Sequence, residues 1–156
     1  MMQVQSLGIR CVFAVVSICT CAVVLNALQV FVRDIQFTSL ETEVSFWGRG
    51  SYEPTVSTRA DVDAQLSLAL QHYPTSAPLL TLRASQLAWE GYWAVSSEDQ
   101  LQYTRVAMEA ELASLHARPA YGQGWLKLLQ YQAVDEAGEE LHEVARAQMQ
   151  TLKRWQ

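Results

Sequence analysis

The fold of this chain is decided by residues 66–93, which read LSLALQHYPTSAPLLTLRASQLAWEGYW. The stretch combines the end of one amphipathic helix, a turn marked by Pro74, and a second helix whose inner face alternates small and large residues. That inner face consists of Leu80, Ala84, Leu87 and Gly91. Because small side chains let a neighbouring helix come close, Ala84 and Gly91 predict a tightly packed helical hairpin.

A fainter copy of this stretch begins 45 positions later. Leu115, Pro119, Trp125 and Ala133 take the places of Leu70, Pro74, Leu80 and Ala88. A proline that closes one helix pair, followed by a large apolar residue that opens the next, resembles the tetratricopeptide repeat. The period is longer than the roughly 34 residues of that repeat, and the chain holds only about one and a half copies. We therefore expect flanking helices to complete the core.

Apolar residues spaced by three and four predict helices on both sides of this stretch. The expected ranges are 37–47, 58–73, 76–95, 97–117, about 125–138 and 139–155. Ser57 or Thr58 is expected to cap the second of these helices, and Ser96 or Ser97 the fourth. The last helix should turn Leu141, Val144, Ala145, Gln148, Leu152 and Trp155 inward. No segment alternates with a period of two, so the predicted class is all-α.

The N-terminal part holds one long uncharged run, from Cys11 to Val32. Its 22 residues would extend about 33 Å as a helix, which matches a hydrocarbon core of about 30 Å. We therefore predict a transmembrane helix over 11–33, after a cytoplasmic tail at 1–10. The alternative is a cleavable signal peptide, with Arg10 and the apolar run as its first two regions. The length of the run and the absence of a small-x-small site after it favour the uncleaved anchor.

A short tail inside and an acidic domain outside is the commoner arrangement for such proteins. The sequence thus predicts a single-pass bacterial inner-membrane protein whose C-terminal domain is periplasmic. The expected organisation is a helix and linker at 34–57, followed by a short stack of antiparallel helical hairpins at 58–156. Asn26 and Gln29 share one face of the predicted span and are candidates for binding another membrane helix, although Gln29 also suits an interfacial position.

Charge and cysteine content exclude several classes of function. After Arg33 the chain has nine Lys and Arg against sixteen Asp and Glu, a net charge of −7. Binding to a phosphate backbone needs clustered cations, so nucleic acid is not an expected partner. All three cysteines lie in the apolar run, which leaves the rest of the chain without a disulfide framework or a cysteine metal site.

Two sets of residues could indicate a metal site or a glycan site. Each is explained more simply as an exposed charged surface or as core packing. Glu139 and His142 have the Glu-x-x-His spacing of a metal-binding bundle, but no second pair accompanies them, which favours a solvated charged face. Glu90 stands among Trp89, Tyr92 and Trp93, as in a site that binds or cleaves a glycan. Core packing with an outward-facing Glu90 is the default. We expect no catalytic residue, cofactor or metal.

Two motifs carry a resemblance to a known family. They are Ala-Trp-x-Gly-Tyr-Trp at Ala88 to Trp93 and Arg-Pro-x5-Trp at Arg118 to Trp125. With the N-terminal run and the outer helical domain, they make the chain resemble the small single-span proteins encoded with bacterial exopolysaccharide genes, the VpsP type. This resemblance implies an accessory role in assembling or exporting a surface polysaccharide, with no catalytic residues to carry over.

The leading hypothesis is therefore a membrane-anchored interaction protein whose helical stack binds other envelope polysaccharide-assembly proteins. The candidate partner-binding residues are Leu80, Arg83, Leu87, Trp89, Trp93 and Trp125. One alternative is a periplasmic glycan-binding or glycan-acting enzyme that uses Glu90. Another is a scaffold of the divisome or of a secretion system, which would share the same architecture.

Overall fold

The computed structural model describes residues 2–131 and 136–153, without the side chains of 2–15, 29, 30, 32 and 33. The described residues form six helices and no strand, so the predicted all-α class is confirmed. The chain divides into two units, Met1–Ser39 and Leu40–Gln156.

The first unit consists of most of helix α1 (Met2–Phe46). Several of its large apolar side chains, including Val23, Leu28 and Phe31, are more than half exposed. A search of the described residues for a helical stretch with the length and hydropathy of a bilayer-crossing segment finds none. The transmembrane helix predicted over 11–33 falls partly on positions whose side chains lie outside the described part, Gln29 among them.

The last turns of α1 belong to the second unit. Leu40, Val44 and Trp47 are buried there, as their spacing predicts. The unit therefore begins at Leu40, whereas the sequence suggested a domain start at residue 58 with a linker before it. The helix ends because Gly48 and Gly50 have φ values of 70° and 62°, a conformation that glycine adopts readily.

The remaining helices of the second unit are α2 (Val56–His72), α3 (Ala77–Trp93), α4 (Ser97–Ala117), α5 (Gly122–Leu128) and α6 (Glu136–Lys153). The predicted cap of α4 is confirmed, because the side chain of Ser96 accepts a hydrogen bond from Asp99 N. Ser76 precedes α3 in an extended conformation, but its side chain makes no capping hydrogen bond. The predicted cap of α2 is wrong. Thr55 caps this helix by accepting from the backbone N–H of Thr58, so α2 begins at Val56.

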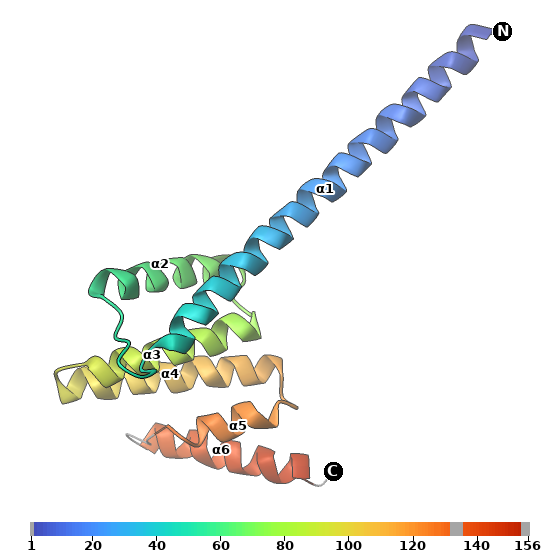
Figure 1. Ribbon diagram of the computed structural model, residues 1–156. Coiled ribbons are helices and arrows are strands. Elements are labelled where there is room, and N and C mark those ends of the chain that lie inside the picture. Colours follow the sequence, from blue (N-terminus) through green and yellow to red (C-terminus); the bar gives the residue numbers. More distant parts are fainter. Residues whose placement is uncertain (1, 132–135, 154–156) are drawn as a thin grey trace. The chain divides into compact units, whose positions relative to one another are not determined.

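Neighbouring helices of the second unit lie side by side in chain order (Figure 1). α3 and α4 are antiparallel, because Ser114 near the end of α4 contacts Ala77 at the start of α3, and Tyr103 lies against Gly91 near the end of α3. A Cβ atom on Gly91 would lie 3.2 Å from Cβ of Tyr103. The prediction that Gly91 allows a close approach of helices is therefore confirmed.

The 45-residue repeat reappears in the backbone of two turns. Tyr73, after α2, has φ −134° and ψ 65°, and Arg118, after α4, has φ −139° and ψ 64°. The N–H of Ser76 donates to Tyr73 O at 3.1 Å, and the N–H of Tyr121 donates to Arg118 O at 3.0 Å. The same turn thus connects α2 to α3 and α4 to α5.

The second copy is shorter than the sequence suggests. We predicted a helix that ends near Gly138, but α5 ends at Leu128 after seven residues. The N–H of Gln130 donates to Lys127 O at 3.0 Å, which closes a tight turn in place of another helical turn. Ala133, the equivalent of Ala88, lies outside the described residues.

Helices α4, α5 and α6 share one hydrophobic cluster, composed of Met108, Leu115, Trp125, Leu128 and Ala145. On α6, Leu141 and Leu152 pack against this cluster as predicted. The inward prediction for Val144 is wrong, because this side chain is 49% exposed, and His142 is buried instead. His142 and Ala145 are three residues apart and share the inner side of the helix. Trp155 lies outside the described residues.

Candidate interaction site

Four aromatic rings gather where the end of α1 meets the end of α3. We call Trp47, Trp89, Tyr92 and Trp93 the aromatic cluster. The ring centroids of Trp89 and Trp93 are 5.4 Å apart in a stacked arrangement, and those of Trp47 and Trp93 are also 5.4 Å apart. Tyr92 meets Trp89 edge to face at 5.6 Å. Trp47 is buried and Trp89 and Trp93 are half-buried, but Tyr92 is 72% exposed. The cluster therefore fixes Trp47, just after the end of α1, against the end of α3 and leaves the Tyr92 ring exposed.

Gly48 lies directly beside this cluster. A Cβ atom at this position would lie 2.0 Å from Cη2 of Trp89, far inside van der Waals contact. The same glycine has a positive φ of 70°. Both its conformation and its lack of a side chain are thus required for the indole of Trp89 to pack on the backbone.

An ion pair borders the aromatic cluster. Arg59 Nη1 of α2 donates to Glu90 Oε2 of α3 at 2.9 Å, and its guanidinium carbon lies 5.1 Å from the ring centroid of Trp93. The prediction of an outward-facing Glu90 is wrong, because both partners are largely shielded from solvent. The carboxylate of Glu90 is engaged in holding α2 against α3.

The candidate partner-binding residues divide into two groups. Leu87 and Trp125 are buried in the core and offer almost no surface to a partner. Trp125 is further fixed because its Nε1–H donates to Pro119 O at 2.8 Å. The other four, Leu80, Arg83, Trp89 and Trp93, are only partly buried.

Arg83 is one of these partly buried residues and makes internal contacts. Its guanidinium pairs with Asp63 of α2 and donates to Gln86 Oε1 at 3.0 Å. Arg83 thus joins α2 to α3. Of the six candidate residues, Trp89 and Trp93 lie together in the aromatic cluster, next to the exposed Tyr92.

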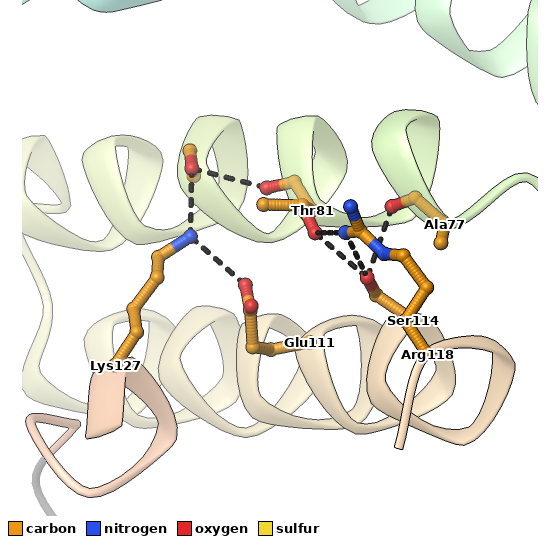
Figure 2. Close-up of polar contacts among 7 residues, drawn as sticks. Ala77, Thr81, Glu111, Ser114, Arg118 and Lys127 are labelled. Atoms are coloured by element: carbon orange, nitrogen blue, oxygen red, sulfur yellow. Dashed lines mark hydrogen bonds and ion pairs between the residues drawn. The ribbon is translucent and has the colours of Figure 1, made fainter. Parts of the chain in front are cut away.

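The hydroxyl groups of Thr81 and Ser114 meet where the start of α3 packs against the end of α4, as Figure 2 shows. Ser114 is fully buried, and its Oγ donates to Ala77 O at 3.0 Å and lies 2.7 Å from Thr81 Oγ1. Arg118 Nη2 donates to both hydroxyl oxygens at 3.1 Å. The guanidinium of Arg118 also lies 4.9 Å from the ring centroid of Tyr121. This network fixes the register of the two helices with directional bonds.

An ion pair between a partly exposed lysine and a buried glutamate connects the same interface to α5 (Figure 2). Glu111 of α4 is 0% exposed, and its Oε2 accepts from Lys127 Nζ at 2.8 Å. Lys127 Nζ also donates to Ser85 Oγ of α3 at 3.0 Å. Three helices therefore meet at one ammonium group.

Sequence reasoning missed Glu111 and Lys127. A signal was present, because Glu111 lies three residues after Met108 and four before Leu115, on the inner side of α4. A charge at such a position implies a buried partner. The identity of that partner depends on how α5 folds back, which the spacing does not specify.

Tyr131 gives a pH-dependent prediction. Its hydroxyl is buried without a hydrogen-bond partner among the described residues, and burial, followed by the charge of Glu111, raises its pKa well above the ordinary value. Stability linked to this group is therefore complete below about pH 10, the pKa of an unfolded tyrosine, and decreases as pH rises above it. Tyr131→Phe should flatten this alkaline loss in urea unfolding curves while neutral-pH stability stays the same or rises. Equal alkaline losses in both proteins would contradict the assignment.

In the part of the chain that the structure describes, Glu139 and His142 do not belong to a larger cluster of metal-binding side chains. His142 is buried, and its Nε2 has no hydrogen-bond partner within the described part of the chain. Across residues 2–131 and 136–153, no three His, Cys, Asp or Glu side chains gather closely enough to hold a metal ion.

Comparisons of the chain with protein-family models, curated proteins and solved structures found no match. The resemblance to the VpsP type and to tetratricopeptide repeats therefore rests on the sequence motifs and stays a prediction.

Proposed function

We propose that this chain is a non-catalytic, membrane-anchored accessory protein of surface-polysaccharide assembly or export, which acts by binding other proteins of that machine. The uncharged run from Cys11 to Val32 supports the anchor, and the resemblance to the VpsP type supports the pathway. The proposed location is the bacterial inner membrane, crossed once, with the helical unit in the periplasm.

The helical unit has features of a tetratricopeptide-like stack. Its helices pack in chain order, and the same turn recurs 45 residues apart, after α2 and after α4. Stacks of this kind bind other proteins through extended surfaces. Ser114 and Glu111, two fully buried polar residues drawn in Figure 2, hold the helices to one another, which favours an interaction role over a catalytic one.

The single observation that carries the interaction role is the exposed ring of Tyr92 in the aromatic cluster. Tyr and Trp dominate the energetics of protein interfaces because they offer large, rigid area with a polar edge. Trp89 and Trp93 hold the Tyr92 ring from one side, so a partner meets a preorganised aromatic surface.

Co-purification tests this function. Full-length protein extracted in a mild detergent should bring with it a polymerase, a glycosyltransferase or an export component, identified by mass spectrometry. Tyr92→Ala should reduce that recovery by about tenfold or more, as expected of a central interface residue. Tyr73→Ala is the matched control, because this tyrosine is also exposed but follows α2 at the opposite end of α3.

Two results would count against the proposal. Recovery of division or secretion proteins in place of polysaccharide components would support the scaffold alternative. An equal effect of Tyr92→Ala and Tyr73→Ala would remove the aromatic cluster as the binding surface. No structural observation favours the alternative of a glycan-acting enzyme, since Glu90 is held by Arg59.

A further inference from the structure

Arg118 is a partly buried base that pairs with no carboxylate in the part of the chain that the structure describes. The other partly buried bases there differ, because Arg59, Arg83 and Lys127 each pair with an acid on another helix. A cation shielded from solvent is costly, and proteins rarely keep one unless an opposite charge neutralises it. The ring of Tyr121, which lies against the guanidinium, offsets only part of this cost.

The surroundings of Arg118 hold its guanidinium in one orientation. Figure 2 shows the group beside the hydroxyls of Thr81 and Ser114, and its Nη2 donates to both oxygens at 3.1 Å. Ser114 is fully buried and donates to Ala77 O, so the backbone of α3 fixes this side of the arrangement. The guanidinium carbon lies 4.9 Å from the ring centroid of Tyr121. A ligand therefore meets a preorganised group, which lowers the entropy cost of binding.

One nitrogen of this guanidinium is available to a ligand. Nε is enclosed and makes no hydrogen bond with the described residues. Nη1 makes none with them either, but it is not among the enclosed atoms. Nη1 carries two N–H donors, and a negatively charged acceptor would both satisfy these donors and neutralise the cation.

The charge at this position favours a carboxylate over a phosphate. Arg118 contributes one cation, and Lys127 on the neighbouring helix α5 is already neutralised by Glu111. One remaining positive charge matches the single charge of a carboxylate. A phosphate group carries nearly two negative charges at neutral pH and would leave part of its charge uncompensated.

We propose that Arg118, with Tyr121 beside it, binds the carboxylate of an aspartate or glutamate side chain on the partner protein. The source of this carboxylate rests on the proposed function, in which the chain acts by binding other proteins. After Arg33 the chain has a net charge of −7, so Arg118 offers an acidic partner a positive contact on an otherwise acidic unit and thereby fixes its position. Arg118 lies near the start of α3, whereas the aromatic cluster lies near its end, so the two are separate contacts.

Sodium acetate is the probe for the site itself. In the full-length ¹⁵N-labelled protein in mild detergent, the Nε–H signal of Arg118, assigned with Arg118→Lys, should shift and saturate with added acetate. Half-saturation is expected at about 10 mM, the strength of one charged hydrogen bond. Arg83 is the internal control, because it already pairs with Asp63 and its signal should stay in place. Sodium chloride at equal ionic strength should give no saturable shift.

Three outcomes of this titration would contradict the site as described. An Arg118 signal that does not saturate with acetate, or that moves equally with chloride, would overturn the binding site. Sodium phosphate that binds at least about tenfold more tightly than acetate would overturn the choice of a carboxylate.

Co-purification identifies the source of the carboxylate. Arg118→Met should reduce recovery of the partner by about tenfold, whereas Arg49→Met should not, although Arg49 also lies against an aromatic ring, that of Phe46. Arg118 also connects α3 to α4, so a second measurement leaves the native sequence intact. Washing the wild-type complex with acetate, at ten times its half-saturating concentration, should release the partner several-fold more than chloride does.

Equal recovery with Arg118→Met and Arg49→Met, or equal release by acetate and chloride, would overturn a partner carboxylate as the ligand. These outcomes are distinct from failure of the proposed function. If the wild-type protein recovers no polysaccharide component, the proposed function fails, and the acetate titration still decides the site at Arg118.

Discussion

Replacing Lys127 by methionine is expected to destabilise the helical unit by about 3 kcal/mol. The substitution removes the cation but keeps most of the side-chain volume, so the carboxylate of the fully buried Glu111 loses its partner. An unpaired buried charge is among the most costly defects in a protein interior. Urea unfolding of the full chain in mild detergent, followed by circular dichroism, measures the change.

A double substitution identifies the cause of this loss. Glu111→Leu combined with Lys127→Met removes both charges and should recover most of the stability, since a well-packed apolar pair can replace a buried ion pair. Ser85→Ala serves as a smaller control, because it removes only one acceptor of Lys127. If Lys127→Met costs no more than Ser85→Ala, the buried ion pair is not what holds α5 to α4.

Replacing Gly48 by alanine is expected to cost about 3 kcal/mol, the second large effect. About 1 kcal/mol comes from forcing alanine into the left-handed conformation at φ 70°. The rest comes from overpacking, because the new methyl group would lie 2.0 Å from the indole of Trp89. The last turn of α1 should then loosen from α3, and the near-UV circular dichroism signal of the stacked tryptophans should fall.

The chain contains a matched control for this substitution. Gly50 has a φ of 62°, but a Cβ atom there would meet nothing within 4 Å. Gly50→Ala should therefore cost only the backbone term of about 1 kcal/mol and leave the tryptophan signal unchanged. Equal costs at Gly48 and Gly50 would show that contact with Trp89 adds nothing. Trp89→Ala should relieve most of the extra cost of Gly48→Ala, because the two residues touch.

Local sequence signals predicted most of the helices because these signals act over a few residues. Ser76 and Ser96 precede α3 and α4, and Pro74 and Pro119 mark the repeated turn. The helix expected over 37–47 carries Leu40 and Val44 four residues apart, and both side chains are buried. Predictions failed where several neighbouring residues can serve as the helix cap. At the start of α2, Thr55 is the cap, whereas we expected Ser57 or Thr58.

The candidate site was predicted less well, because exposure depends on what packs against a residue. Trp125 and Trp93 look alike as large aromatic residues of a repeat, yet Trp125 is enclosed by α4 and α6 while Trp93 stays half-buried. Glu90 and Glu111 are both acidic residues on helices, and each pairs with a base on another helix. Sequence spacing specifies the side of a helix but not its neighbour.

The sequence by itself thus determined the all-α class, the order of the helices and the close approach of another helix at Gly91. The tertiary structure alone decided that Trp89 packs over Gly48, and that Lys127 neutralises Glu111. The physical reason is the distance along the sequence over which each kind of interaction acts. Caps, turns and apolar periodicity are set by residues within four positions of each other, whereas these contacts join residues 16 and 41 positions apart whose meeting depends on how whole helices pack.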